Sequence, residues 1–286
     1  VYGVILGAAL HLGIQIPGLI KYKFRWVPRI GLNTEPVRKV LRLMGPRLAT
    51  MLAIQLIFLV RDNLASRLEV GAVTSLTYGW MIFQAPETLI GTAIGTAMLP
   101  TLAEHFARQE WEQFRAGVER AVQVLIAITV PVSVVMSLGL RPLVDLAFGL
   151  PPETTDLLLW VTRGYLAGLA GQCLLEVANR SFYARQDART PLFGAVLNLG
   201  IYVLLGSQLF RVLGAPGISL TDAIAFTAQA VILLWILNRR LVGRFSVRSG
   251  IGRTVLAALA SGATVGLLMY FGGQFSPVFS SLVAML

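Results

Sequence analysis

Charged residues are scarce in this chain. Only 13% of its 286 residues are Asp, Glu, Lys or Arg, whereas soluble domains usually carry about 25%. Hydrophobic residues make up 56%, and the mean hydropathy is +0.72. Since the apolar residues form blocks near the roughly 20 residues that cross a bilayer, the composition excludes an ordinary soluble α/β domain and predicts membrane-spanning helices.

Cysteine and histidine are nearly absent. The chain has one cysteine, Cys173, which cannot form a disulfide within the chain and is expected to be a small buried side chain. Neither it nor the two histidines show metal-site spacing. A phosphate-binding loop, a nucleophile elbow and an HExxH motif are missing too, so the sequence favours a secondary transporter or flippase over an enzyme.

The apolar blocks predict an all-α, multi-pass membrane protein. Strands of alternating hydrophobicity, typical of an outer-membrane barrel, are missing. Full segments are expected at 1–20, 45–68, 74–102, 119–140, 155–179, 190–212, 215–238 and 252–272, with a partial one at 275–286. Because the chain starts without Met inside one apolar block and ends inside another, we expect a fragment cut at both ends.

The net charge of +10 follows from basic linkers. Of the 24 Lys and Arg residues, 19 lie in alternate linkers on one side of the membrane, and the linker 21–44 is the most basic. This bias places that side in the cytoplasm, which explains the charge better than nucleic-acid binding does. Within that linker, Thr34 before Pro36 predicts a helix start.

One cytoplasmic stretch, 104–114, is amphipathic. Its large apolar residues, together with one just beyond it, fall roughly on one helical face: Phe106, Trp111, Phe114 and Val118. We expect a helix that lies along the membrane interface.

Polar side chains inside apolar segments mark candidate sites, because each ionisable group there costs about 2.5–3.5 kcal/mol. The candidates for substrate binding are Arg61, Gln84, Glu87, Glu176 and Arg180. A structural role stays open for the charged ones. Arg61 fits an interfacial position at the outer helix end as well as a cavity wall, and Glu176 with Arg180 fits an i, i+4 ion pair.

Pro86 interrupts the third segment, and proline both kinks a helix and removes a hydrogen-bond donor. With Glu87 directly after it, the kink fits a transport hinge and simple packing equally well. Gly91 and Gly95 form a small-xxx-small face, which predicts a close helix contact.

Three segments also supply oxygen ligands from Asp62, Asn198 and Asp222. Two carboxylates and an amide suit a hard cation such as sodium, the one cofactor that the sequence suggests. By residue count, however, Asn198 lies one to two turns deeper than the two acids.

Three motifs are more specific. They are PETLIGTAIGTAMLPTL at 86–102, FYARQDARTP at 182–191 and GAPGISL at 214–220. In order and spacing they resemble the MurJ/MviN family of lipid II flippases, and the resemblance covers essentially the whole chain.

The resemblance implies the multidrug/oligosaccharidyl-lipid/polysaccharide exporter fold, with two six-helix lobes around a central cavity and two extra C-terminal helices. Residues 1–20 would be the last helix of the first lobe and 21–44 the cytoplasmic interlobe linker. Residues 45–238 would form the second lobe, and 239–286 the extra helices.

The implied function is to flip the undecaprenyl-pyrophosphate-linked disaccharide-peptide to the outer leaflet of the bacterial plasma membrane by alternating access, in support of cell-wall synthesis. Its expected partners are this substrate and membrane lipids, with no nucleic acid, and the protein is expected to be a monomer. Another exporter of the superfamily and a non-transporting scaffold of cell-wall assembly stay open.

Some positions depart from the family pattern. Trp80 and Met81 stand where many members carry an acid–arginine pair, and Gln84 stands where an acid is common. We hypothesise that Arg61 compensates for the lost arginine. The resemblance also implies a sodium site in some members, which Asp62 and Asn198 fit, although Tyr202 replaces a residue that is often polar. Without the first lobe's arginines, this chain alone is not expected to flip lipid.

Overall fold

The computed structural model describes residues 2–22, 34–241, 257–258 and 260–266, and in these ranges every regular element is a helix. The chain divides into two compact units, Val1–Arg42 and Leu43–Leu286. The first unit contains α1 (Tyr2–Lys21), whose side chains are exposed along its whole length. The all-α membrane fold expected from the composition is therefore confirmed.

Helix α2 (Glu35–Ala65) starts directly after Thr34, whose carbonyl accepts a hydrogen bond from the N–H of Arg38 at 3.0 Å. The helix start predicted at Thr34 is thus confirmed. Other basic residues predicted to flank the helices lie outside the described residues: Lys23, Arg25, Arg29, Arg244, Arg248 and Arg253.

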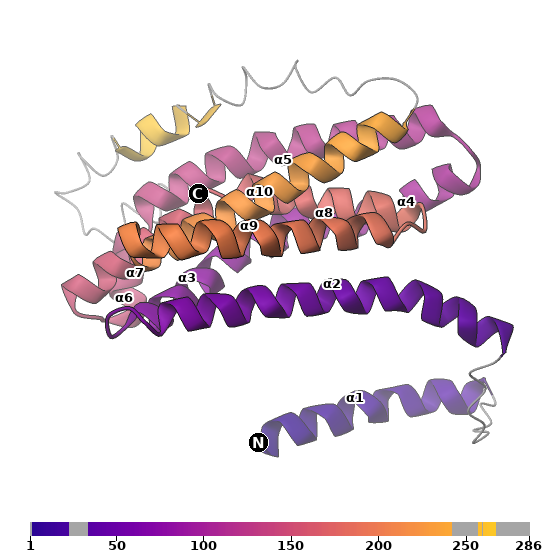
Figure 1. The fold of residues 1–286 in the computed structure, drawn as a ribbon, viewed down its shortest axis with the longest axis horizontal. Helices are drawn as coiled ribbons and strands as arrows, with labels where there is room; N and C mark the ends of the chain where they lie inside the picture. Colours follow the sequence, from indigo (N-terminus) through magenta and orange to yellow (C-terminus); the bar gives the residue numbers. More distant parts are fainter. Residues whose placement is uncertain (1, 23–33, 242–256, 259, 267–286) are drawn as a thin grey trace. The chain divides into compact units, whose positions relative to one another are not determined.

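The second unit contains the remaining elements. They are α3 (Ala72–Pro86), η1 (Glu87–Thr92), α4 (Ala93–Ala107), α5 (Trp111–Gly139), α6 (Arg141–Phe148), α7 (Pro152–Leu166), α8 (Leu169–Ala184), α9 (Arg189–Leu213) and α10 (Ala215–Arg240). Figure 1 shows α5, α8, α9 and α10 running alongside one another.

Among the described residues, five helices are long and apolar enough to cross a membrane: α1, the Met44–Ala65 part of α2, α5, α9 and α10. Two further predicted segments are present as interrupted helices. Segment 74–102 is divided into α3, η1 and α4, and segment 155–179 is divided into α7 and α8 by a break at Ala167 and Gly168. The six segments predicted for one lobe are thus all found.

The amphipathic stretch 104–114 is not an interfacial helix, and that prediction was wrong. The chain turns at Gln109, whose φ is 59°, so that α4 ends before the turn and α5 begins after it. Phe114 and Val118 are fully buried, and Phe106 meets Trp111 edge to face at a ring distance of 5.6 Å. The apolar face therefore packs into the core, because the turn folds it inward.

Other boundaries also differ from the prediction. Helix α5 begins eight residues before the expected start at 119, and α6 fills what was expected to be a simple outer linker. Of the predicted segment 252–272, residues 257–258 and 260–266 are helical, and a Cβ at Gly262 would lie 3.1 Å from Val134 of α5. The predicted remnant at 275–286 lies outside the described residues.

Helix α10 packs very closely against α7 and α8. Gly164, Gly168 and Gly171 face Ser219, Ala223 and Thr227, which recur every four residues along α10. A Cβ at Gly171 would lie 2.8 Å from both Cα and Cβ of Thr227, so only glycine fits without a shift. Small residues in this pattern let two backbones approach in a membrane, where apolar side chains gain little by leaving lipid.

The predicted glycine contacts of the third segment are also confirmed. A Cβ at Gly91 would lie 2.8 Å from Sγ of Cys173, and one at Gly95 would lie 3.4 Å from Cγ of Arg180. Cys173 is a free and fully buried thiol, as the sequence predicted. These contacts hold η1 and α4 against α8.

We expect Gly171→Val to destabilise the fold by about 1–3 kcal/mol, the usual effect of overpacking a filled interface. The measurement is the thermal unfolding midpoint of the purified protein in detergent. Gly200→Val is the matched control, because a Cβ at Gly200 of α9 meets nothing within 4 Å. Equal midpoints for the two variants would contradict the close contact of α8 with α10.

Candidate functional site

The interruption after Pro86 shapes the first candidate surface. Pro86 has no N–H, and the six residues after it form the π-helix η1, a local widening that is frequent at functional sites. Around it, Met81, Gln84, Ala85, Thr88 and Leu89 line a hollow of about 390 Å³. Gln84 is exposed there and offers donors and an acceptor to a polar ligand. Thr88 is also exposed, but its hydroxyl already donates to Glu87 and is left as an acceptor.

Glu87 was predicted to line the substrate cavity, but its side chain is buried inside the lobe and does not line the hollow. It is 8% exposed, and its carboxylate accepts hydrogen bonds from the hydroxyls of Thr88 at 3.3 Å and Thr92 at 3.2 Å. The two threonines supply donors that a buried carboxylate requires. Glu87 therefore supports the widened helix from inside.

Glu176 and Arg180 form the predicted i, i+4 pair on α8, with Nη2 of Arg180 3.2 Å from a carboxylate oxygen of Glu176. Their side chains are 24% and 27% exposed, and they lie against Gly95 of α4. Glu176 also interacts electrostatically with Glu87. The structure thus brings three of the five substrate-site candidates together between α8 and η1–α4.

Arg61, the fourth candidate, lies in a separate polar cluster. Only 8% of the residue is exposed, and its Nε donates to a carboxylate oxygen of Asp62 at 3.1 Å. Its guanidinium lies 4.7 Å from the ring centre of Phe58, a cation–π contact. Its electrostatic partners include Asp222 of α10 and Tyr165 of α7. A ligand outside the lobe reaches little of this side chain.

The three predicted sodium ligands have different surroundings. The side chain of Asp62 is 57% exposed, whereas Asp222 is 4% and Asn198 1% exposed. Nδ2 of Asn198 donates to Oε1 of Gln229 at 2.8 Å. Asp62 and Asp222 both act electrostatically on Arg61. No group of three or more His, Cys, Asp or Glu side chains suited to a metal occurs in the described part of the chain.

Trp80, where the resemblance implies an acid in many members, belongs to an aromatic cluster. Its ring lies 5.4 Å from that of Tyr165, 5.2 Å from Phe83 and 5.7 Å from Phe58. Met81 is instead 60% exposed at the hollow. Trp80 and Met81 therefore belong to different surroundings, one inside the lobe and one on its surface.

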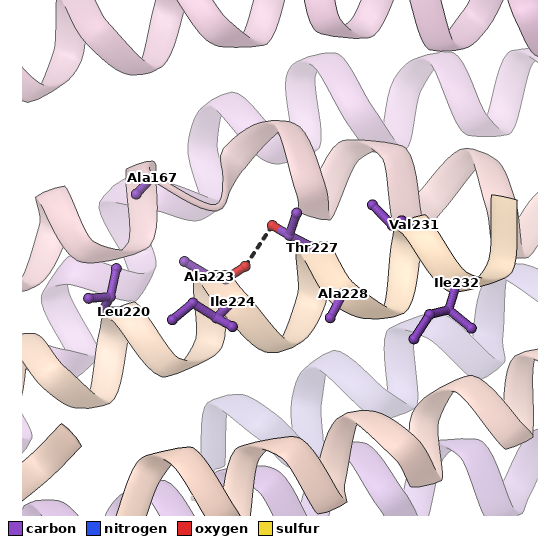
Figure 2. A pocket seen from close by; sticks show the side chains of 8 residues that line it. All are labelled: Ala167, Leu220, Ala223, Ile224, Thr227, Ala228, Val231 and Ile232. Atoms are coloured by element: carbon purple, nitrogen blue, oxygen red, sulfur yellow. Dashed lines mark hydrogen bonds between the residues drawn. The ribbon is translucent and has the colours of Figure 1, made fainter. Parts of the chain in front are cut away.

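A second hollow, of about 540 Å³, lies along α10 (Figure 2). Its lining consists of Ala167, Leu220, Ala223, Ile224, Thr227, Ala228, Val231 and Ile232. The hydroxyl of Thr227 donates to the carbonyl of Ala223 at 2.6 Å, as the dashed line in Figure 2 shows. With its hydroxyl donor already used, this surface suits hydrocarbon rather than a headgroup.

The motif at 182–191 forms a tight connection between α8 and α9, with Gln186 at φ 57°. Asp187 accepts hydrogen bonds from the N–H groups of Arg189 and Thr190, at 3.0 and 3.1 Å. Its other oxygen accepts from the Thr190 hydroxyl at 2.6 Å and from Arg240 at 2.8 Å. The motif therefore ties the start of α9 to the end of α10.

The hydrogen bonds to Asp187 favour its ionised form. Partial burial acts to raise its pKa, but the hydrogen bonds from Thr190, Arg240 and the N–H of Arg189 outweigh burial and hold the pKa below its ordinary value. Burial and the neighbouring Arg240 in turn lower the pKa of Arg185.

Comparison with known proteins gives a consistent result. A family model described as "Lipid II flippase MurJ" matches residues 1–286. The "Lipid II flippase MurJ" of Burkholderia cenocepacia is 28% identical over 248 residues, which cover 84% of this chain and 48% of that protein. The "Probable lipid II flippase MurJ" of Rhizobium meliloti is 30% identical, over 80% of this chain and 45% of that protein. The chain thus spans about half the length of these curated relatives.

Solved structures show the same fold. "Lipid II flippase MurJ, inward closed conformation" matches with a TM-score of 0.75 at 18% identity, covering 99% of this chain and 58% of that one. An outward-facing multidrug resistance MATE family transporter of the MOP superfamily matches with a TM-score of 0.66 at 17% identity, over 84% and 56%. At these identities the structures establish the fold alone.

We expect Asp187→Asn to lower stability at neutral pH by roughly 0.5–1 kcal/mol, because it removes the ion pair with Arg240. Since the folded pKa of Asp187 is lowered, its contribution is complete above the unfolded value near 3.9 and is lost as pH falls through the folded value. Thermal midpoints of the two proteins should therefore converge in acid.

Asp145→Asn is the control, because its carboxylate lies 4.0 Å from Arg141 and is half exposed. A difference between Asp187→Asn and the wild type that persisted unchanged below pH 3 would show that charge is not its source.

Proposed function

The chain belongs to the lipid II flippase MurJ family, and we propose that the protein encoded by its full reading frame moves lipid II from the cytoplasmic to the outer leaflet. The family match over residues 1–286 is the observation that carries this proposal. The fold is that of a transporter lobe in the bacterial inner membrane, and we propose alternating access of two lobes as the mechanism.

Within this function the candidate residues take different roles. Gln84 is the one that contacts substrate, because it is exposed in the hollow beside η1. Glu176 and Arg180, each about a quarter exposed, act at the edge of the path. Glu87 holds the widened helix in shape from inside.

The π-helix gives a physical basis for movement. Six residues with wider turns lie between two α-helices and are held against α8 mainly by the small Gly91 and the thiol of Cys173. Such a segment changes register at lower cost than a continuous α-helix does, and π-bulges are frequent at functional sites. We propose that α3 tilts about η1 as the lobe changes conformation.

The substrate, undecaprenyl-pyrophosphate linked to a disaccharide-peptide, presents a polar headgroup and a hydrocarbon tail. The Gln84 hollow supplies hydrogen bonds to the polar part, and the apolar hollow along α10 suits hydrocarbon chains of membrane lipids. We propose that the protein acts as a monomer. We do not propose sodium as the coupling ion, because Asp222 already has Arg61 as its cationic partner.

The test is complementation. The full reading frame should support growth of bacteria depleted of their own lipid II flippase, and it should expose lipid II at the outer leaflet. We expect Gln84→Leu to slow flipping about tenfold, the effect of roughly 1.4 kcal/mol from one lost hydrogen bond. Met81→Leu, in the same hollow and equally apolar, should retain the wild-type rate.

Each outcome has a meaning. Failure of a well-inserted full-length protein to rescue growth would indicate another exporter of the superfamily or a scaffold. Rescue with an unchanged rate in Gln84→Leu would keep the function but remove Gln84 from the substrate path.

A further inference from the structure

The polar cluster around Arg61 is built from four helices of the lobe. Arg61 comes from α2, Tyr165 from α7, Tyr202 from α9 and Asp222 from α10. All four are at most 8% exposed, and Tyr202 is fully buried. The two tyrosines, Asp222 and Arg61 interact electrostatically with one another. The cluster is therefore one site rather than four separate positions.

Several polar atoms of this site have no hydrogen-bond partner within the described ranges. They are Nη1 of Arg61, the hydroxyls of Tyr165 and Tyr202, and Oδ1 of Asn198, one turn before Tyr202. Buried polar atoms are normally paired. Here they come from three helices, α2, α7 and α9, and mark a polar region inside the lobe, which we call the chamber.

Asp222 places a carboxylate in the chamber, which therefore requires a positive charge beside it. Its carboxylate is almost fully buried, and a buried anion is costly unless a cation accompanies it. Among the described residues, Arg61 is the one group of opposite charge that acts on Asp222. The cation is covalently part of the chain, and a guanidinium does not lose its proton in proteins.

A sodium ion does not fit these surroundings. Asp62 is more than half exposed and already binds Nε of Arg61, and Asn198 is linked through Nδ2 to Gln229. A second cation beside Asp222 would face the guanidinium, which repels it. Tyr202, one turn after Asn198, adds a bulky and fully buried ring to these surroundings.

We propose that the Arg61 guanidinium is the resident cation of this chamber and takes the place that a sodium ion would hold beside Asp222. Arg61 is thus a determinant of ion specificity, and it makes the lobe insensitive to sodium. Phe58 lies against the guanidinium, and Trp80 packs on the ring of Phe58 in turn.

The test is thermal unfolding of the full-length protein in detergent, with sodium titrated against choline at constant ionic strength. The wild type should show no sodium-specific shift. Arg61→Met keeps the alkyl packing but removes the charge, so Asp222 loses its partner. We expect a lower midpoint in choline for this variant, and a rise of about 2–4 °C on adding sodium.

A double variant distinguishes the loss of the charge pair from simple misfolding. Arg61→Met with Asp222→Asn removes both charges, and its midpoint should recover toward the wild type and show no sodium response. Arg61→Lys retains a cation and should also stay insensitive to sodium.

Three results would overturn the proposal. They are a sodium-specific shift in the wild type, no sodium response in a folded Arg61→Met protein, and a double variant no more stable than Arg61→Met. None of these unfolding measurements follows lipid transport. They can therefore fail without any failure of the proposed flipping activity.

Discussion

The close approach of α10 to α7 and α8 is the contact on which the rest of the lobe depends. Gly164, Gly168 and Gly171 bring these backbones together without intervening side chains. Tyr165 lies next to the first of these glycines, and Asp222 lies just before Ala223, which faces the second. The glycine contact therefore determines how deeply Tyr165 and Asp222 are buried, and with them the charge that Arg61 must balance.

Much of the fold could be predicted from the sequence, because lipid imposes a simple rule on length and polarity. The six segments of the lobe, the buried Cys173 and the Gly91 contact all followed from local pattern. The 104–114 stretch did not, because its apolar face fits an interface and a core equally well. Only the turn at Gln109, which depends on the packing of α4 against α5, distinguishes the two.

The candidate site was less predictable. The sequence indicated that Arg61, Glu87 and Gln84 were unusual in an apolar setting, but not which way each side chain points. Pro86 and the π-helix rotate Glu87 inward and leave Gln84 outward, a difference that a regular helical period does not contain. Tyr165 escaped the sequence analysis altogether, and Tyr202 was noted only as a departure from the family pattern. A tyrosine in an apolar segment gives no signal until its hydroxyl is found without a partner.

The position of Arg61 bears on how an anionic headgroup is recognised. Arg61 interacts with both Asp62 and Asp222, so the group as a whole carries no surplus positive charge with which to attract a pyrophosphate. Arg180 is likewise matched by Glu176, and the lining of the Gln84 hollow contains no cation. Neutral hydrogen bonds gain little over water, whereas charge-assisted ones are about twice as strong. The described lobe is therefore suited to orient a headgroup through Gln84 and Thr88, and the attraction of its negative charge must come from cations outside these surfaces.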